Sequence, residues 1–342
     1  MSETITDQST VLGGHMLRRL IFTIAAVMMI GSWHLSLAAT CPDYTALEQT
    51  PTLPTPEKES FDHFGSRLIS SLYTPYHMVH DALVTEGNQA TVVGKFDYDI
   101  ALHKDLEDET VYAYLYGTGM NSWEFLGTYT TDSDGKVYVD AGKRAAGEYT
   151  VYMVVAGDLS TATGYLSVIE PGSDAILFDI DGTLTLTDFE EVGDYLGIST
   201  AKAYNYATDV VNAYKNKNYR IIYVTGRPYW LAKDSREWLA LKQIPMAHLH
   251  TNPNGEIFQP SDVAVYKGDY IRQLIDSGVN IVRAYGNATT DIEAYADAGI
   301  AKSNTYIIGK HAGEEGTQAL GEDYSEHYAT VVANTPVASC SR

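Results

Sequence analysis

Two carboxylates stand two residues apart at the end of a short apolar run. Asp179 and Asp181 follow residues 175–178, and Gly182 and Thr183 come next. Such a run is typical of a buried parallel strand, and open α/β sheets bind ligands beyond the carboxyl ends of their strands. The pair could hold a divalent cation while one carboxylate attacks an electrophile and the other transfers a proton. A polar Asp-Gly turn without chemistry is the alternative.

Three further groups follow in order along the chain. They are a hydroxyl after a strand candidate, a lysine opening a helix-like segment, and an amide and a carboxylate after another strand candidate: Thr225 after 221–224, Lys267 opening 267–276, and Asn287 and Asp291 after 281–286. Each group alone is weak evidence for an active site; a lysine at a helix start, for example, is usually a solvated charge. Together, in this order, they resemble the motif set of haloacid-dehalogenase-type phosphohydrolases.

Phosphoryl-transfer chemistry assigns a role to each group. We expect Asp179 to be the nucleophile and Asp181 the general acid and base. The transferring phosphoryl group would be bound by four residues: Thr225, Gly226, Arg227 and Lys267. For Arg227, a salt bridge to a local carboxylate is an equally good interpretation.

The predicted chemistry implies one Mg²⁺ ion, which neutralises charge between the phosphate and the carboxylates. The candidate ligands are oxygen atoms, as Mg²⁺ prefers: those of Asp179, Asp181 (through its backbone carbonyl), and Asn287 or Asp291. The histidines lack tight metal spacing. His248 and His250, separated by one residue on a predicted strand, are the one histidine pair that stays a candidate.

Length and charge limit the possible functions. The 342 residues leave room for about two domains, and 45% of them are hydrophobic, which supplies a sizeable core. The formal net charge of −21 argues against nucleic acid as a partner, since phosphate neutralisation needs clustered Lys and Arg. The same charge weakens electrostatic docking on anionic membranes.

The N-terminal segment 1–39 has the features of an export signal. Arg18 and Arg19 precede the apolar run 20–30, and small residues for cleavage follow up to Ala39. The apolar run is shorter than the ~20 residues that span a bilayer, so cleavage is favoured over an uncleaved anchor. We therefore expect a periplasmic or secreted protein.

The two cysteines lie near the ends of the mature chain. Cys41 follows the predicted cleavage site, and Cys340 is close to the C-terminus. In an oxidising compartment they could form a disulfide. A lipidated Cys41 is the alternative, although the residues before it match a lipoprotein signal poorly.

Periodicity divides the rest of the chain into a linker at 40–65, a β-sandwich at 66–170 and an α/β domain at 171–335. Period-two segments in the second part are strand candidates: 92–98, 111–116, 123–127, 136–139 and 149–155. Helix candidates in the third part are residue 199 or 200 to about 217, 228–242, 267–276 and 289–297. The fold class is a Rossmann-like haloacid-dehalogenase domain after an all-β domain. About 40 residues separate successive site motifs, which leaves no room for a large cap.

Segments spread over both domains carry a family resemblance. Residues 74–309 resemble the C-terminal region of the membrane-associated phosphatidylinositol transfer proteins of the retinal degeneration B type, at 74–79, 90–96, 222–228, 284–286 and 305–309. The second half is also similar to the catalytic domain of lipins, which are Mg²⁺-dependent phosphatidate phosphatases. The transfer proteins lack the leading aspartate, whereas Asp179 and Asp181 are both present here, as in lipins.

The resemblance implies lipid-related phosphate chemistry, and three functions remain open. The favoured one is an exported Mg²⁺-dependent phosphatase acting on a phosphomonoester, with phosphatidic acid at a membrane surface as a candidate substrate. The second is a phosphatidic-acid-binding module without turnover. The third is a surface interaction protein that uses mainly the β-sandwich.

Overall fold

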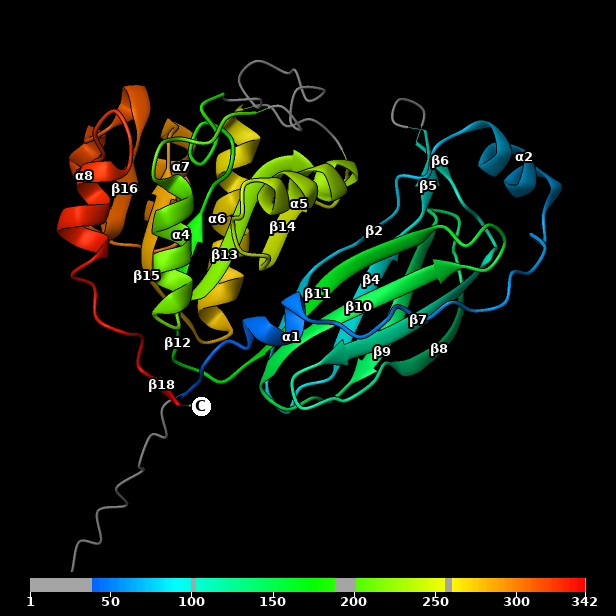
Figure 1. Ribbon diagram of the computed structural model, residues 1–342. Helices are drawn as coiled ribbons and strands as arrows, with labels where there is room; N and C mark the ends of the chain where they lie inside the picture. The colour runs from blue at the N-terminus through cyan, green and yellow to red at the C-terminus, as the bar shows by residue number, and fades with distance from the viewer. Residues whose placement is uncertain (1–38, 100–102, 188–200, 256–259, 342) are drawn as a thin grey trace, which may run out of the picture. The chain divides into compact units, whose positions relative to one another are not determined.

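An all-β region precedes an α/β region, in the order that the sequence predicts (Figure 1). The computed structural model describes residues 39–99, 103–187, 201–255 and 260–341. Most of the predicted signal peptide and the predicted helix caps Ser199 and Thr200 lie outside the described residues. β11 ends at Ile169 and β12 begins at Ser173, on either side of the predicted domain boundary.

Alternating burial along the strands produces the β-sandwich. In β7 (Thr110–Gly117) half-buried and buried residues alternate, so one side of the strand faces the core. One sheet has the order β3 (Ala82–Thr85), β11 (Thr161–Ile169), β10 (Gly147–Val155), β7, β8 (Glu124–Thr130); the other has β2 (Met78–Val79), β4 (Ala90–Lys95), β9 (Lys136–Gly142). The short strands β5 (Asp97–Tyr98) and β6 (Lys104–Asp105) pair with each other. The two larger sheets share an apolar core that includes Leu115, Val139 and Val151.

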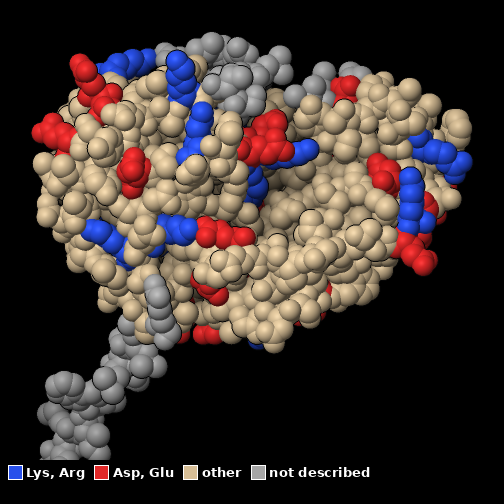
Figure 2. Space-filling view, in the orientation of Figure 1, with Lys and Arg blue, Asp and Glu red and all other residues tan. Residues whose placement is uncertain are grey.

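The outer face of the five-stranded sheet is aromatic and carries little charge. Tyr114 of β7 makes ring contacts with Phe125 of β8 and Tyr152 of β10. Figure 2 shows few charged side chains over this part of the molecule. The segment predicted as an extended linker crosses this face, because the indole of Trp123 donates a hydrogen bond to the Pro51 carbonyl (3.3 Å). That segment also contains the helix α1 (Tyr44–Glu48), and α2 (Phe64–Leu72) follows it.

Six parallel strands form the sheet of the α/β region. Their order is β14 (His248–Asn252), β13 (Arg220–Pro228), β12 (Ser173–Phe178), β15 (Val279–Gly286), β16 (Thr305–Ile307), β17 (Gln318–Ala319). Both faces are covered, which explains why the central strands are apolar runs rather than alternating ones. α4 (Ala207–Asn216) and α5 (Ala232–Leu241) pack on one face, and α6 (Pro260–Asp276) and α7 (Thr289–Asp297) on the other. The carboxyl ends of β12, β13 and β15 therefore meet at one edge.

Short helical turns complete the α/β region. They are η2 (Tyr229–Leu231), η3 (Lys302–Asn304), η4 (Gly309–His311), η5 (Glu314–Gly316), α8 (Ser325–His327) and η6 (Tyr328–Val332). In the part of the chain that the structure describes, no helix is both long and apolar enough to cross a bilayer.

Three helix predictions are wrong in their starting points, whereas α7 has the predicted bounds. α4 begins at Ala207, because Tyr206 before it has a left-handed backbone (φ 63°). The segment predicted to be helical from residue 228 starts with Pro228 still in β13. α6 begins at Pro260, so Lys267 lies about two turns inside the helix instead of opening it.

The two ends of the described chain are joined. β1 (Ala39–Thr40) pairs in parallel with β18 (Cys340–Ser341), and Cys41 and Cys340 form a disulfide. This is the cysteine pair considered from the sequence. The bond joins two cysteines that are 299 residues apart in sequence, which restricts the unfolded state.

A buried ion pair connects the β-sandwich to the α/β region. Asp81, between β2 and β3, accepts a hydrogen bond from Nη2 of Arg236 on α5 (2.6 Å). Its carboxylate also accepts the backbone N–H groups of Leu249 on β14 (2.7 Å) and Tyr165 on β11 (2.7 Å). Because the Asp81 side chain is fully buried, the loss of its cation would leave an uncompensated charge.

Candidate active site

Asp179 and Asp181 lie at the carboxyl end of the central strand β12. The N–H of Asp179 donates to the carbonyl of Tyr285 on β15 (3.0 Å), which extends the strand pairing by one residue. The chain then turns sharply, and Gly182 has a φ of 67°, a conformation that favours glycine. Three of the following N–H groups donate to the carbonyl of Ile180. Both carboxylates are 1% exposed, so the turn buries them instead of presenting them to solvent.

Lys267 and Thr183 fix the two oxygens of Asp179. Nζ of Lys267 lies 2.8 Å from Asp179 Oδ1 and 3.0 Å from Asp291 Oδ1. The hydroxyl of Thr183 donates to Asp179 Oδ2 (2.8 Å) and lies 3.2 Å from Oδ1 of Asn287. One lysine therefore compensates two carboxylates, and one hydroxyl connects Asp179 to the loop after β15.

Asp291 organises the start of α7. Its Oδ2 accepts the backbone N–H groups of Asn287 (3.0 Å) and Ala288 (3.1 Å), while Oδ1 contacts Lys267. Both oxygens are thus engaged within the protein. The approach is close at Gly286, where a Cβ atom would lie 2.6 Å from the Cβ of Asp291. Of the two residues offered by the sequence as metal ligands, Asn287 is connected to Asp179 through Thr183 and Asp291 through Lys267.

Arg227 holds Asp181 with both sides of its guanidinium group. Nε donates to Oδ2 (2.8 Å) and Nη2 to Oδ1 (2.6 Å), and Nη1 donates to the hydroxyl of Ser235 on α5 (2.8 Å). Thr225 Oγ1 lies 3.4 Å from Asp181 Oδ2. Both charged side chains are fully buried. Of the two interpretations that the sequence left open for Arg227, the structure contains the salt bridge.

The predicted site residues gather at this sheet edge through contacts with one another, and Gly226 follows Thr225 within β13. The sequence analysis missed Thr183 and Ser235. Thr183 directly follows the Asp-Gly turn and could have been found there. Ser235 gave no signal, because its role depends on the packing of α5 against β13.

Two buried tyrosines support the site. Tyr295 donates from its hydroxyl to the carbonyl of Tyr285 (2.8 Å), and Tyr324 donates to the carbonyl of Thr183 (3.0 Å). Burial raises the pKa of both phenols well above the usual value, and the nearby charge of Asp179 adds to this effect. Both hydroxyls therefore stay protonated and keep donating.

The chemistry of the oxygen donors fits Mg²⁺. Among the described residues, no three Asp, Glu, His or Cys side chains are grouped in a way that could hold a metal. The predicted ligand set needs only one carboxylate, Asp179, together with an amide oxygen and a backbone carbonyl. The Thr183 hydroxyl lies 2.8 Å from Asp179 Oδ2 and 3.2 Å from Asn287 Oδ1, so it links these two oxygens. Such hard donors, completed by water, are what Mg²⁺ accepts.

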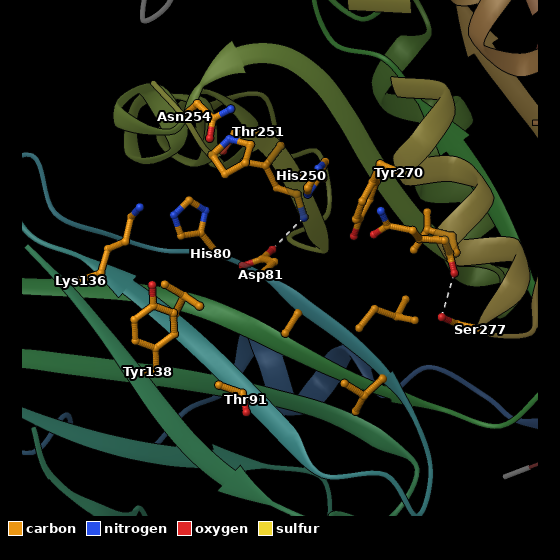
Figure 3. Close-up of a pocket in the computed structure, with 18 residues that line it drawn as sticks. His80, Asp81, Thr91, Lys136, Tyr138, His250, Thr251, Asn254, Tyr270 and Ser277 are labelled. Atoms are coloured by element: carbon orange, nitrogen blue, oxygen red, sulfur yellow. Dashed lines mark hydrogen bonds between the residues drawn. The ribbon is translucent and has the colours of Figure 1, made fainter. Parts of the chain in front are cut away.

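A pocket of about 470 Å³ lies apart from this cluster, and none of its lining residues belongs to the cluster. In Figure 3, His80 comes from the β-sandwich side and His250 and Tyr270 from the α/β side. The rings of His250 and Tyr270 stack with centroids 3.3 Å apart. Burial lowers the pKa of His80 and His248 to about 4, and that of His250 well below the usual value. The pair His248 and His250 is therefore neutral and packed among aromatic rings.

Comparisons with known proteins agree with this division. Residues 75–168 match the family model "PITM 1-3, beta-sandwich domain", and residues 176–309 match "PITM 1-3, LNS2 domain". Among solved structures, a class C acid phosphatase from Bacillus anthracis aligns with 35% of this chain and 54% of its own at 18% identity. Its TM-score of 0.29 is too low to support a functional argument.

Three curated relatives cover both domains. Membrane-associated phosphatidylinositol transfer protein 3 from Mus musculus is 28% identical over 87% of this chain and 30% of its own length. Its namesake from Homo sapiens is 30% identical over 76% of this chain and 26% of its own. Protein retinal degeneration B from Drosophila melanogaster is 27% identical over 75% of this chain and 20% of its own length. The chain spans less than a third of the length of these relatives. It combines a β-sandwich domain with a lipin-like LNS2 domain of haloacid-dehalogenase fold, and it is a distant homologue of the membrane-associated phosphatidylinositol transfer proteins.

Proposed function

We propose that this chain is a Mg²⁺-dependent phosphomonoester hydrolase in which Asp179 is the nucleophile. The observation that carries the proposal is the state of the Asp179 carboxylate, which Lys267 and Thr183 hold from both oxygens at the end of β12. A nucleophilic carboxylate must be ionised and oriented, and these partners supply both conditions.

The reaction would proceed in two displacements. An oxygen of Asp179 attacks phosphorus, the bond from phosphorus to the ester oxygen breaks, and an aspartyl-phosphate forms. Asp181 gives its proton to the leaving alkoxide, and it later takes one from the water that attacks the aspartyl-phosphate. That second attack releases inorganic phosphate and restores Asp179. Mg²⁺, when bound, would neutralise phosphate charge next to the carboxylates.

Lys267 and Thr225 would stabilise the charge that spreads over the phosphoryl oxygens. Lys267 is shared between two carboxylates, so its ammonium can reorient toward a third anion without leaving the site. Arg227 is fixed by Ser235 as well as by Asp181. We expect Arg227 to orient Asp181 and to adjust as Asp181 gains or loses its proton.

We further propose phosphatidic acid as a substrate. The relatives are named for phosphatidylinositol transfer, which supports a lipid ligand with a phosphate group. The described connections between the site motifs contain no large cap domain that would keep a membrane surface away from this sheet edge.

The test is phosphate release from the purified full chain with Mg²⁺, compared with Asp179→Asn. Phosphatidic acid in detergent micelles and para-nitrophenyl phosphate are the two substrates. We expect wild type to release phosphate, Asp179→Asn to lose at least about 10⁴-fold in kcat, and chelation of Mg²⁺ to abolish the reaction. Equal release by wild type and variant would contradict the proposal.

A binding module without turnover is the second candidate, and the clamp on Asp181 favours it. Both oxygens of Asp181 accept hydrogen bonds from Arg227, so this carboxylate is engaged within the protein and not directed at a leaving group. In this case phosphatidic acid would bind with Asp179 present but no phosphate would be released. Binding of phosphatidic acid by Asp179→Asn, measured beside turnover by wild type, separates the two candidates.

We propose that the protein is exported. The segment 1–39 has the features of a signal peptide, and a disulfide between Cys41 and Cys340 is stable in oxidising compartments. Cell fractionation with intact mass measurement of the recovered protein tests this. We expect a mature chain without residues 1–38 or 1–39 and two hydrogens lighter than its reduced form. A full-length, reduced protein in the cytoplasmic fraction would contradict it.

A further inference from the structure

The helix α2 carries an apolar face that is turned toward solvent. Phe64, Leu68 and Leu72 are spaced four residues apart and are 75%, 46% and 64% exposed. Residues at this spacing share one side of a helix. A single exposed apolar side chain is ordinary, but a continuous exposed row of three calls for an explanation.

The exposure of this row does not come from a loosely attached helix. On the opposite side, Ser66 is buried and Ile69 packs against the core of the β-sandwich. The buried carboxylate of Glu109 accepts the N–H groups of Asp62 and His63 just before the helix (2.9 Å each). The helix is thus anchored at its entry and along one face, and this anchoring turns the apolar row outward.

The charge of α2 itself differs from that of the chain as a whole, and the exposed Asp62 lies two residues before the helix. Between residues 64 and 72 there is one arginine, Arg67, and no acidic residue, although the chain has a net charge of −21. Lys104 of β6 lies 5.5 Å from the ring of Tyr73, the residue that follows the helix. In Figure 1, α2 lies beside the β5–β6 hairpin at one end of the β-sandwich. An apolar row with basic neighbours is typical of helices that lie in the interface of a phospholipid bilayer.

The size of the row argues against a protein partner. Three side chains of this kind expose on the order of a few hundred Å². A stable protein interface buries about 800 Å² on each partner. A bilayer has no such minimum, since a short row of Phe and Leu can insert into fluid acyl chains one side chain at a time.

We propose that α2 is a membrane-docking helix, which inserts Phe64, Leu68 and Leu72 into a phospholipid surface and brings the chain to a lipid phosphomonoester in that surface. This proposal rests on the proposed function, because it assigns the substrate of the same site to a membrane. Docking adds weak, reversible binding that the active site alone does not supply.

The test uses the full chain as the cell produces it, the triple variant Phe64→Gln/Leu68→Gln/Leu72→Gln, and a matched control, Leu241→Gln/Val337→Gln. The control changes two residues that are 66% and 61% exposed but lie far from α2 in sequence. Glutamine keeps helix propensity close to that of leucine. The measurements are flotation with phosphatidylcholine vesicles, with and without phosphatidic acid, and hydrolysis of vesicle phosphatidic acid and of para-nitrophenyl phosphate.

We expect wild type and control to float with both vesicles, and the triple variant to lose binding by on the order of 100-fold. The variant should hydrolyse para-nitrophenyl phosphate like wild type and vesicle phosphatidic acid much more slowly. Flotation of the variant like wild type would overturn the docking proposal. So would a wild-type dimer that the variant dissociates, because a second copy would then cover the row.

The two proposals fail in different ways. If wild type hydrolyses neither substrate but its flotation depends on α2, docking stands and the phosphatase proposal falls. If wild type hydrolyses para-nitrophenyl phosphate, but the α2 substitutions change neither flotation nor the hydrolysis of vesicle phosphatidic acid, the phosphatase proposal stands and docking falls. Should the triple variant misfold, Leu68→Cys carrying an environment-sensitive dye replaces it, since the only two cysteines form a disulfide. A dye signal unchanged by vesicles would then overturn docking.

Discussion

The edge of the α/β sheet and the contact between the two domains both bury ion pairs, yet the pairs are built differently. At the sheet edge, Lys267 serves two carboxylates and its neighbours are side chains that could meet a ligand. At the domain contact, Asp81 has a single cation, Arg236, and two backbone N–H groups. A shared cation tolerates the loss or addition of one anion, whereas a single cation does not. Burial of charge alone therefore does not identify a reactive site.

The largest effect on activity is expected at the sheet edge, from Asp179→Asn. Asp179→Asn should lower kcat by at least about 10⁴-fold and leave the free energy of unfolding within about 1 kcal/mol of wild type. Lys267 keeps Asp291 as its partner in this variant, so no buried charge is left alone. Phosphate release and urea unfolding of the same preparation measure both quantities. If Asp179→Asn lost stability as well as activity, the sheet edge would not differ from the domain contact in this respect.

Breaking the domain contact should have the opposite effect. Arg236→Met leaves the fully buried Asp81 without a cation, and we expect a loss of about 3–5 kcal/mol in the free energy of unfolding. It also removes the guanidinium 4.5 Å from the ring of Tyr165. Phosphate release per folded molecule should stay near wild type. The double variant Asp81→Asn/Arg236→Met is the control, because it removes both charges and should recover part of the stability. If Arg236→Met is as stable as wild type, the ion pair between Asp81 and Arg236 does not stabilise the fold.

Arg227→Lys sharpens the comparison within the site. Lysine keeps the charge but cannot donate to both oxygens of Asp181 and to Ser235 at once, so the carboxylate should lose its orientation. We expect kcat to fall by about 10²-fold, with a smaller change in KM and a changed pH–rate profile. Ser235→Ala should act in the same direction by about tenfold. An unchanged pH–rate profile in both variants would show that Arg227 does not position Asp181.

Acid should weaken the fold through buried histidines. Burial lowers the pKa of His77, His248 and His327 to about 4, against about 6.5 in the unfolded chain. Between these values the unfolded state binds more protons, so the free energy of unfolding is complete above pH 6.5 and decreases as the pH falls toward 4. The loss is on the order of 1–3 kcal/mol for each histidine. Urea unfolding at pH 7 and pH 5 measures it, with His248→Gln expected to have a smaller pH dependence. Stability that rises on acidification would contradict this assignment.

These two regions also differ in how far the sequence predicts them. Asp179 and Asp181 stand in one local motif after an apolar strand, so their place at a sheet edge follows from the chain itself. Asp81 lies in a stretch without clear periodicity, and its partners are 84 or more residues away. Such long-range pairs depend on how α5 and β14 pack, which periodicity does not report.

The difference between local and long-range information also explains where the predicted elements differ from the structure. The sequence analysis places Lys267 at a helix start, whereas α6 begins at Pro260. The apolar periodicity that fixes α6 begins before Lys267, with Val263 and Ala264 buried. The strand β11 is absent from the predicted strands, although it pairs along its length with β10, because its first half carries small and polar residues.

The central claim is that Asp179 becomes phosphorylated, and trapping of that intermediate tests it most directly. The full chain with Mg²⁺ and para-nitrophenyl phosphate is quenched in acid during turnover, and its peptides are analysed by mass spectrometry. We predict the mass of one phosphoryl group on Asp179 in wild type, a larger amount in Asp181→Asn because hydrolysis of the intermediate lacks its base, and none in Asp179→Asn. Phosphate release by wild type with no phosphoryl group on Asp179, in either wild type or Asp181→Asn, would contradict the account.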